Sequence, residues 1–245
     1  MYSVLAVGAH PDDIELGCGG ALAAHRAAGD AVTMLVLTGG QNGPGSLQAR
    51  LDEQEEAART LGAVLLWGHL IDCAVTADAS TVSAIEQTIA AVAADVIYVH
   101  APHDSHQDHR AAAAATISAA RYGSRVLHYQ SPSTTSFNPT VYIDVAAHLD
   151  RKLAALACHH SQVTGSAMVD PDVVEATARY QGAQARLKYA EAYEPARFVW
   201  DLGRIPAVPA EPATLAVPAT LAVPHARPHW DGQHSGADAS RVRLR

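Results

Sequence analysis

The fold class of this chain is indicated by one stretch near its N-terminus, Val4-Leu5-Ala6-Val7-Gly8-Ala9-His10-Pro11-Asp12-Asp13-Ile14-Glu15-Leu16-Gly17. Its first residues are apolar, as in a buried strand, and polar residues follow them without a spacer. An imidazole, His10, and two adjacent carboxylates, Asp12 and Asp13, stand directly behind that strand. Pro11 stiffens the turn and favours an extended conformation at His10. The stretch therefore predicts a strand that delivers metal-binding groups and a spare base to one edge of a sheet.

A second polar cluster repeats this arrangement further along the chain. The apolar run 96–99 is followed by a tract that contains His103, Asp104, His106, Asp108 and His109. The carboxyl ends of parallel strands meet near a topological switch point in an open α/β sheet, so the two clusters can share one ion. Imidazole and carboxylate ligands suit zinc or iron(II), and three protein ligands with an open fourth position form a catalytic site. A single cluster of this kind usually consists of ordinary polar loop residues, whereas the two His-rich clusters together predict a catalytic metal site.

Strand-like and helical segments alternate over residues 1–204. The strand-like runs are 2–7, 32–37, 64–66, 96–99, 126–129 and 140–143, and the helical segments are 20–28, 46–61, 79–94, 109–121, 146–158 and 171–193. This βαβ alternation predicts a single Rossmann-like α/β domain, in which helices flank both faces of a mainly parallel sheet.

The chain changes character over residues 205–245. The segment 206–224 contains Pro-Ala-Thr-Leu-Ala-Val twice in tandem, at 212–217 and 218–223. Frequent prolines block helices and inner strands, so we expect a disordered, Pro/Ala-rich low-complexity tail. The alternative is a docking tail, or a lid over the active site of a neighbouring subunit in a homo-oligomer.

Composition favours a soluble enzyme that acts on a small molecule. The chain has 245 residues, 49% of them hydrophobic, and a net charge of −8 without basic clusters, which argues against nucleic acid or an anionic membrane as a partner. Cys18, Cys73 and Cys158 show no C-x-x-C spacing, which is typical of a reduced cytoplasmic setting. We also expect no signal peptide and no membrane-spanning run.

Glycines after the first strand suggest a dinucleotide-binding turn as an alternative. Gly17, Gly19 and Gly20 follow that strand closely, but the turn itself holds Asp12, Asp13 and Glu15, whose charges would repel a pyrophosphate. No acidic residue ends the run 32–37 to bind a ribose. We therefore expect the glycines to let a helix lie close to the sheet.

The two clusters carry a family resemblance. The residues are 9–15 (AHPDDIE) and 106–109 (HQDH), supported by 50–53, 61–62, 160–162 and 189–193. With these motifs the chain resembles the LmbE/PIG-L family of metal-dependent de-N-acetylases over residues 1–204. Two positions depart from the family pattern, because Ile14 stands where a glutamate is frequent and Gln107 replaces the usual proline. Neither departure removes a ligand.

The resemblance implies a role for each residue at the site. It implies that His10, Asp13 and His109 bind the metal, Zn²⁺ or alternatively Fe²⁺, that Asp12 is the general base, and that His106 faces the substrate carbonyl as a cation. This agrees with the chemistry of adjacent carboxylates, since one can bind the metal while the other accepts a proton.

Neighbouring residues have supporting roles in this interpretation. We place Asp108 with the catalytic group, because Asp108 or Asp104 can hydrogen-bond an imidazole and orient it. We interpret His100 and His103 as supporting or loop residues rather than ligands.

Two further residues and one loop are candidates for substrate binding. The resemblance implies that Arg50 reaches the substrate, and the alternative is an exposed salt bridge with Glu53 or with Gln54 nearby. Asp72 ends a strand region and is a candidate for a sugar hydroxyl. The Gly-rich loop 38–45 is a candidate for the same task, with a plain surface loop as the alternative.

By this resemblance the protein removes the N-acetyl group of an N-acetylglucosamine-type conjugate, giving acetate and a free amine. One alternative is an amidase of the same mechanism that acts on a mycothiol-type thiol conjugate. Another is a metal-containing sugar-binding protein without turnover. Asp12 argues against the last, because a binding protein has no need of a free carboxylate beside its metal.

Overall fold

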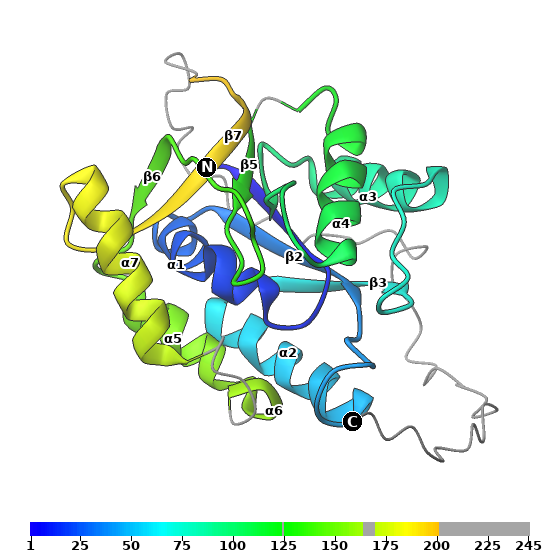
Figure 1. Ribbon diagram of the computed structural model, residues 1–245. Helices are drawn as coiled ribbons and strands as arrows, with labels where there is room; N and C mark the ends of the chain where they lie inside the picture. The colour runs from blue at the N-terminus through cyan, green and yellow to red at the C-terminus, as the bar shows by residue number, and fades with distance from the viewer. Residues whose placement is uncertain (124, 164–169, 201–245) are drawn as a thin grey trace, which may run out of the picture. The chain divides into compact units, whose positions relative to one another are not determined.

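One seven-stranded sheet organises the part of the chain that the computed structural model describes, residues 1–123, 125–163 and 170–200. Its order is β3-β2-β1-β4-β5-β7-β6 (Figure 1). The strands are β1 Ser3–Gly8, β2 Ala31–Thr38, β3 Val64–Leu70, β4 Val96–His100, β5 Arg125–Tyr129, β6 Val141–Asp144 and β7 Ala190–Phe198. The pairs among β1 to β5 are parallel, whereas β7 pairs antiparallel with both β5 and β6. The predicted mainly parallel sheet is confirmed.

Helices cover both faces of this sheet, as predicted. They are α1 Asp13–Ala27, α2 Leu47–Leu61, α3 Ala79–Val92, α4 Gln107–Ala119, α5 Leu149–Ala157, α6 His160–Val163 and α7 Pro171–Ala185. Helices α1, α2, α5 and α7 contact one another on one face, and α3 contacts α4 on the other (Figure 1). None of the helices in the described ranges has the length and apolar character needed to cross a membrane.

The strands read as continuous apolar runs because each face has its own core. Along β1, Val4 and Ala6 point to the core beneath α1 and α2, while Leu5 and Val7 point to the core beneath α3 and α4. All four side chains are fully buried. A parallel sheet with helices on both faces requires this pattern.

Helix α1 starts earlier than the expected segment 20–28. It begins at Asp13, so its first turns contain Gly17, a poor helix former in solution. A Cβ built on Gly17 would lie 2.1 Å from the ring of Tyr129. Close approach of the helix to the sheet therefore explains this glycine, which agrees with the role expected for it.

The expectation of one helix over 171–193 is wrong at its C-terminal end. Helix α7 ends at Ala185, where Arg186 adopts a left-handed conformation with φ 61°. Strand β7 follows and inserts between β5 and β6. Its first three residues, Ala-Glu-Ala, are good helix formers, so pairing with two strands overrides local propensity. The short helix α6 was also not expected, and the predicted tail 205–245 lies outside the described residues.

Candidate metal centre

The two polar clusters meet because of the strand order. Strand β1 lies between β2 and β4 and is parallel to both, so the chain reverses its direction of progress across the sheet between β1 and β4. Residues 9–13 follow β1 and residues 101–109 follow β4. Both segments therefore lie at the carboxyl edge of the sheet, at its topological switch point.

The side chains of the three predicted ligands form a triangle, in which a different carboxylate oxygen of Asp13 faces each imidazole. His10 Nδ1 lies 3.2 Å from Asp13 Oδ2, Asp13 Oδ1 lies 3.3 Å from His109 Nε2, and the two imidazole nitrogens are 3.3 Å apart. Ligands at the corners of a tetrahedron with bonds of about 2.0 to 2.1 Å are about 3.3 Å apart. The donor atoms and their spacing therefore fit a tetrahedral ion.

The charge of the site also calls for a cation. Burial by itself lowers the pKa of His10, but hydrogen bonds with Asp108, Asp13 and Asp72 outweigh it and raise that pKa to about 12. Burial likewise opposes protonation of His109, yet Asp13 and Asp104 raise its pKa to about 9. Buried carboxylates thus keep protons on the imidazoles, and a divalent ion would replace those protons.

A carboxylate lies on the far side of each of these imidazoles. Asp108 Oδ2 is 3.2 Å from His10 Nε2, and Asp104 Oδ2 is 3.2 Å from His109 Nδ1. Such carboxylate–histidine pairs fix the ring orientation and tautomer of a metal ligand. Asp108 is fully buried and also accepts hydrogen bonds from the backbone N–H groups of Cys73 and Val75. This contact with His10 agrees with the orienting role expected for Asp108, and its place in the catalytic group stays a prediction.

Asp12 stands beside this triangle in an unusual backbone conformation, with φ 90° at the N-cap of α1. Its N–H donates to Gln54 Oε1, and the Gln54 amide in turn donates to Glu15 Oε1. No hydrogen bond to the Asp12 carboxylate is found among the described residues. Burial, and then the charge of Asp13, raise the pKa of Asp12 to about 7. Positive φ outside glycine is uncommon and clusters at functional sites.

The surroundings of His106 oppose a positive charge on its ring, and the cation expected there stays a prediction. Its Nδ1 accepts the N–H of Asp108 at 3.2 Å, at the N-cap of α4. Burial lowers the pKa of His106, and His10 and His109 lower it further. A neutral ring that accepts at Nδ1 carries its proton on Nε2, where it can donate a hydrogen bond.

The two predicted substrate-binding residues are committed to other partners. Arg50 is buried and donates to the backbone oxygens of Gly40 and Pro11, so the exposed salt bridge weighed for it is wrong. Asp72 lies 3.1 Å from His10 Nε2 and accepts the N–H of Asn42. Both hold the loop 38–45 against the metal-binding turn, and their contact with substrate stays a prediction.

His100 lies beside the proposed ligands, with its Nε2 3.2 Å from Asp13 Oδ2, and its interpretation as a non-ligand stays a prediction. Its ring stacks on that of His109 at 3.9 Å, and its Nε2 accepts the N–H of Ala9. Burial lowers the pKa of His100 to about 4, so the ring is neutral. His103 is exposed, and its backbone oxygen accepts from Thr135.

Two residues of the site were not identified from the sequence. Gln54 follows Arg50 by one helical turn, so the shared helix face was the available signal. Ser131 follows β5, and its Oγ lies 2.6 Å from Asp104 Oδ2 and 3.4 Å from His109 Nδ1. Its position past the carboxyl end of a parallel strand is the signal that identified the other clusters.

Comparison with known proteins gives a family match and a relative that is more than 30% identical. The model of the GlcNAc-PI de-N-acetylase family, PIG-L, matches residues 5–120, which include both clusters. The uncharacterized deacetylase YaiS of Escherichia coli (strain K12) is 36% identical over 167 residues, which are 64% of this chain and 90% of YaiS.

Solved structures share the fold. The N,N'-diacetylchitobiose deacetylase of Pyrococcus horikoshii superposes with a TM-score of 0.71 at 21% identity, over 79% of this chain and 83% of that one. The 4-carboxy-2-hydroxymuconate hydratase GalB of Pseudomonas putida KT2440 gives a TM-score of 0.72 at 22% identity, over 82% of this chain and 100% of that one. A deacetylase and a hydratase thus share this fold, so fold similarity alone does not define the reaction.

Proposed function

Because this chain belongs to the PIG-L family of de-N-acetylases, and is thus a hydrolytic N-deacetylase, we propose that it removes the N-acetyl group from a conjugate of N-acetylglucosamine. The products are acetate and a free amine. The observation that carries the proposal is the Asp12 carboxylate, which lacks a hydrogen-bond donor among the described residues and lies beside a triangle of metal-binding atoms.

His10, Asp13 and His109 would hold the metal, which we propose is zinc, with iron(II) as the alternative. When bound, such an ion supplies Lewis acidity that activates water and polarises an amide carbonyl. The spacing of 3.2 to 3.3 Å between the three ligand side chains supports zinc, since three protein ligands leave one position open.

The residues around the metal ligands have different roles in amide hydrolysis. Asp12 accepts a proton from the attacking water as the new C–O bond forms, and it passes that proton to the amine nitrogen as the C–N bond breaks. His106 donates its Nε2–H to the carbonyl oxygen, where negative charge develops. Asp108 and Asp104 hold the two metal-binding rings in place.

The charge of the site supports a neutral sugar conjugate. Asp12, Asp13 and Asp72 line this edge of the sheet, and a phosphate there would need a free cation. The terminal nitrogens of Arg50 already donate to backbone oxygens. We therefore expect an N-acetylglucosaminyl glycoside to react faster than the corresponding sugar phosphate.

A panel of substrates tests this expectation through acetate release. It contains N-acetylglucosamine, a neutral glycoside, a sugar phosphate and an N-acylated thiol conjugate. Preference for the phosphate contradicts the charge argument, and cleavage of the thiol conjugate alone favours the mycothiol-type amidase.

The three free cysteines agree with action in the cytoplasm.

The decisive experiment replaces Asp12 with asparagine. Asp12→Asn keeps the shape of the side chain and tolerates positive φ, so the protein should fold and retain its metal. Its kcat should fall by about two to four orders of magnitude. Asp52→Asn, at an exposed position of α2, is the matched control and should keep full activity. Normal turnover in Asp12→Asn would refute the assigned base.

A further inference from the structure

A buried amide from α2 holds the backbone beside the proposed base. Gln54 is fully buried, and its Oε1 accepts the backbone N–H of Asp12 at 3.2 Å. Its Nε2 donates to Glu15 Oε1 at 2.6 Å. Asp12 has φ 90°, a conformation that a residue with a side chain keeps only where its surroundings impose it. The contact with Gln54 is therefore one of the constraints on the position of Asp12.

Glu15 determines which way the Gln54 amide faces. The oxygen of a side-chain amide only accepts hydrogen bonds, its nitrogen donates them, and the two ends have nearly the same shape. Because Glu15 Oε1 accepts, the amide nitrogen must face Glu15, which leaves the amide oxygen for the N–H of Asp12. In the reversed amide, two donors would face each other at Asp12 and this hydrogen bond would be lost.

His159 is the charged neighbour of Glu15. It lies in the short connection between α5 and α6, it is fully buried, and its Nε2 is 3.6 Å from Glu15 Oε1. Neither nitrogen of its ring makes a hydrogen bond within the described part of the chain. Burial by itself lowers the pKa of His159, but the charge of Glu15 outweighs burial and raises that pKa. The imidazole therefore compensates the buried carboxylate.

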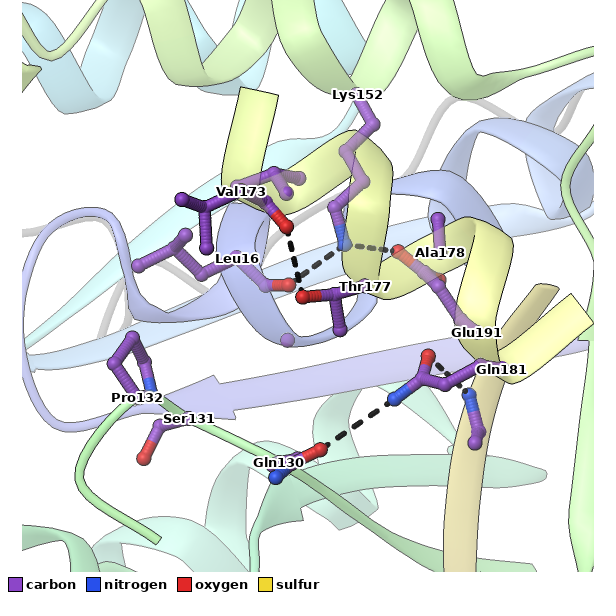
Figure 2. A pocket seen from close by; sticks show the side chains of 13 residues that line it. Leu16, Gln130, Ser131, Pro132, Lys152, Val173, Thr177, Ala178, Gln181 and Glu191 are labelled. Carbon is purple, nitrogen blue, oxygen red and sulfur yellow. Dashed lines mark hydrogen bonds and ion pairs between the residues drawn. The ribbon is translucent and has the colours of Figure 1, made fainter. Parts of the chain in front are cut away.

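Two other cations on neighbouring segments have different partners. Lys152 of α5 donates to Glu191 Oε1 and to a backbone oxygen of α1, as Figure 2 shows. The terminal nitrogens of Arg50 donate to backbone oxygens. Among the described residues, the ion pair of Glu15 is with His159.

We propose that His159, Glu15 and Gln54 are positioning residues for the general base. His159 holds the carboxylate of Glu15, Glu15 orients the amide of Gln54, and Gln54 holds the backbone of Asp12 beside the metal ligands. The inference rests on the proposed function, because it requires Asp12 to be the base of the reaction.

The first test removes the amide at constant side-chain length. Gln54→Met loses both hydrogen bonds, so its kcat for methyl N-acetylglucosaminide should fall about a hundredfold in the zinc-loaded protein. Its KM and zinc content should stay at the parent values, because Gln54 contacts neither substrate nor metal in this proposal. Gln87→Met, at an exposed position of α3, is the matched control and should keep the parent kcat. A parent kcat in Gln54→Met, or a loss of zinc from it, would refute the positioning role.

Substitutions of Glu15 test the orientation of the amide. Glu15→Gln retains an oxygen that can accept from Gln54 Nε2, so its kcat should fall by less than about tenfold. Glu15→Met has no such oxygen and should lose as much kcat as Gln54→Met. Equal losses in the two Glu15 variants would contradict the orienting role. If Gln54→Met does not fold, Glu15→Met replaces it in every comparison.

A double variant tests whether His159 acts through the same contacts. His159→Met should lower kcat, and the combination of His159→Met with Gln54→Met should lower it no further than Gln54→Met alone. Losses that multiply in the double variant would show that His159 acts independently of Gln54, which contradicts the proposal.

Amide hydrogen exchange, followed by NMR, separates this inference from the proposed function. The N–H of Asp12 should exchange slowly in the parent protein and in Gln87→Met, and much faster in Gln54→Met. If this difference is found while the parent protein releases no acetate from any substrate of the panel, the positioning contacts stand and the proposed function fails. If acetate is released but the Asp12 N–H exchanges equally in Gln54→Met and the parent, the proposed function stands and this inference fails.

Discussion

His10 is the residue at which the two polar clusters meet. Its Nδ1 faces Asp13 and His109, and its Nε2 faces Asp108 and Asp72. With carboxylates beside the Nε2 edge, the ring donates there and offers the Nδ1 lone pair to an ion. One imidazole therefore links the residues after β1 with those after β4, and it depends on buried acids that would be costly without a cation.

We expect metal binding to depend on the triangle and not on histidine content. His109→Ala removes one corner, so most of the metal should be lost and activity with it. His103→Ala, at an exposed position of the same segment, should keep the metal content of the parent protein. Elemental analysis of the purified proteins checks both outcomes, and full metal occupancy in His109→Ala would disprove the ligand set.

Helix α1 shows how an element places these residues. Its N-terminus holds Asp13, and its glycines allow it to lie close to the sheet and to the β6–α5 segment. Gly17 contacts the ring of Tyr129, whose hydroxyl donates to Val7 O in β1, and Gly20 contacts Val145. A bulkier residue at Gly17 would push the helix outward and move Asp13 with it.

Alanine substitutions in α1 test this close approach. Gly17→Ala should lower the free energy of unfolding by about 2 to 3 kcal/mol, because its Cβ would lie 2.1 Å from the Tyr129 ring. At Gly19 the nearest atom to an added Cβ is Lys152 Cγ at 3.3 Å, which belongs to a flexible side chain. Gly19→Ala should therefore change stability by less than about 1 kcal/mol. Urea unfolding measures both, and equal values would show that α1 can shift at no cost.

At the scale of the whole molecule, strand order creates the site. The crossover from β3 to β4 places β4 beside β1, and the reversal at β1 opens the edge where the two clusters meet. The antiparallel pair β7 and β6 then extends the sheet beyond β5, so that Glu191 of β7 reaches α1 and Lys152 of α5. The metal centre therefore depends on contacts between segments far apart in the chain.

The proposed limit of the folded domain, residues 1–204, is testable by truncation. Removal of residues 205–245 deletes the tandem repeat but none of the described strands, helices or proposed ligands. We expect the melting temperature to change by less than about 5 °C and the metal content to stay the same. A larger drop in the melting temperature would mean that the tail stabilises the domain.

The sequence alone predicts the α/β class from the alternation of apolar runs and helical segments, and it predicts the two clusters because each lies in the turn directly after a strand-like run. The spacing of hydrophobic residues, the residue types in a turn and the types of metal-binding side chain can all be seen within a short segment, and residues 4–17 contain all three. The strand at 190–198 depends on tertiary contacts, because pairing with β5 and β6 outweighs the helix propensity of Ala-Glu-Ala. The tertiary structure also decided that Arg50 is buried and that Asp108 orients His10, since hydrogen-bond partners far apart in the chain depend on the order in which strands assemble.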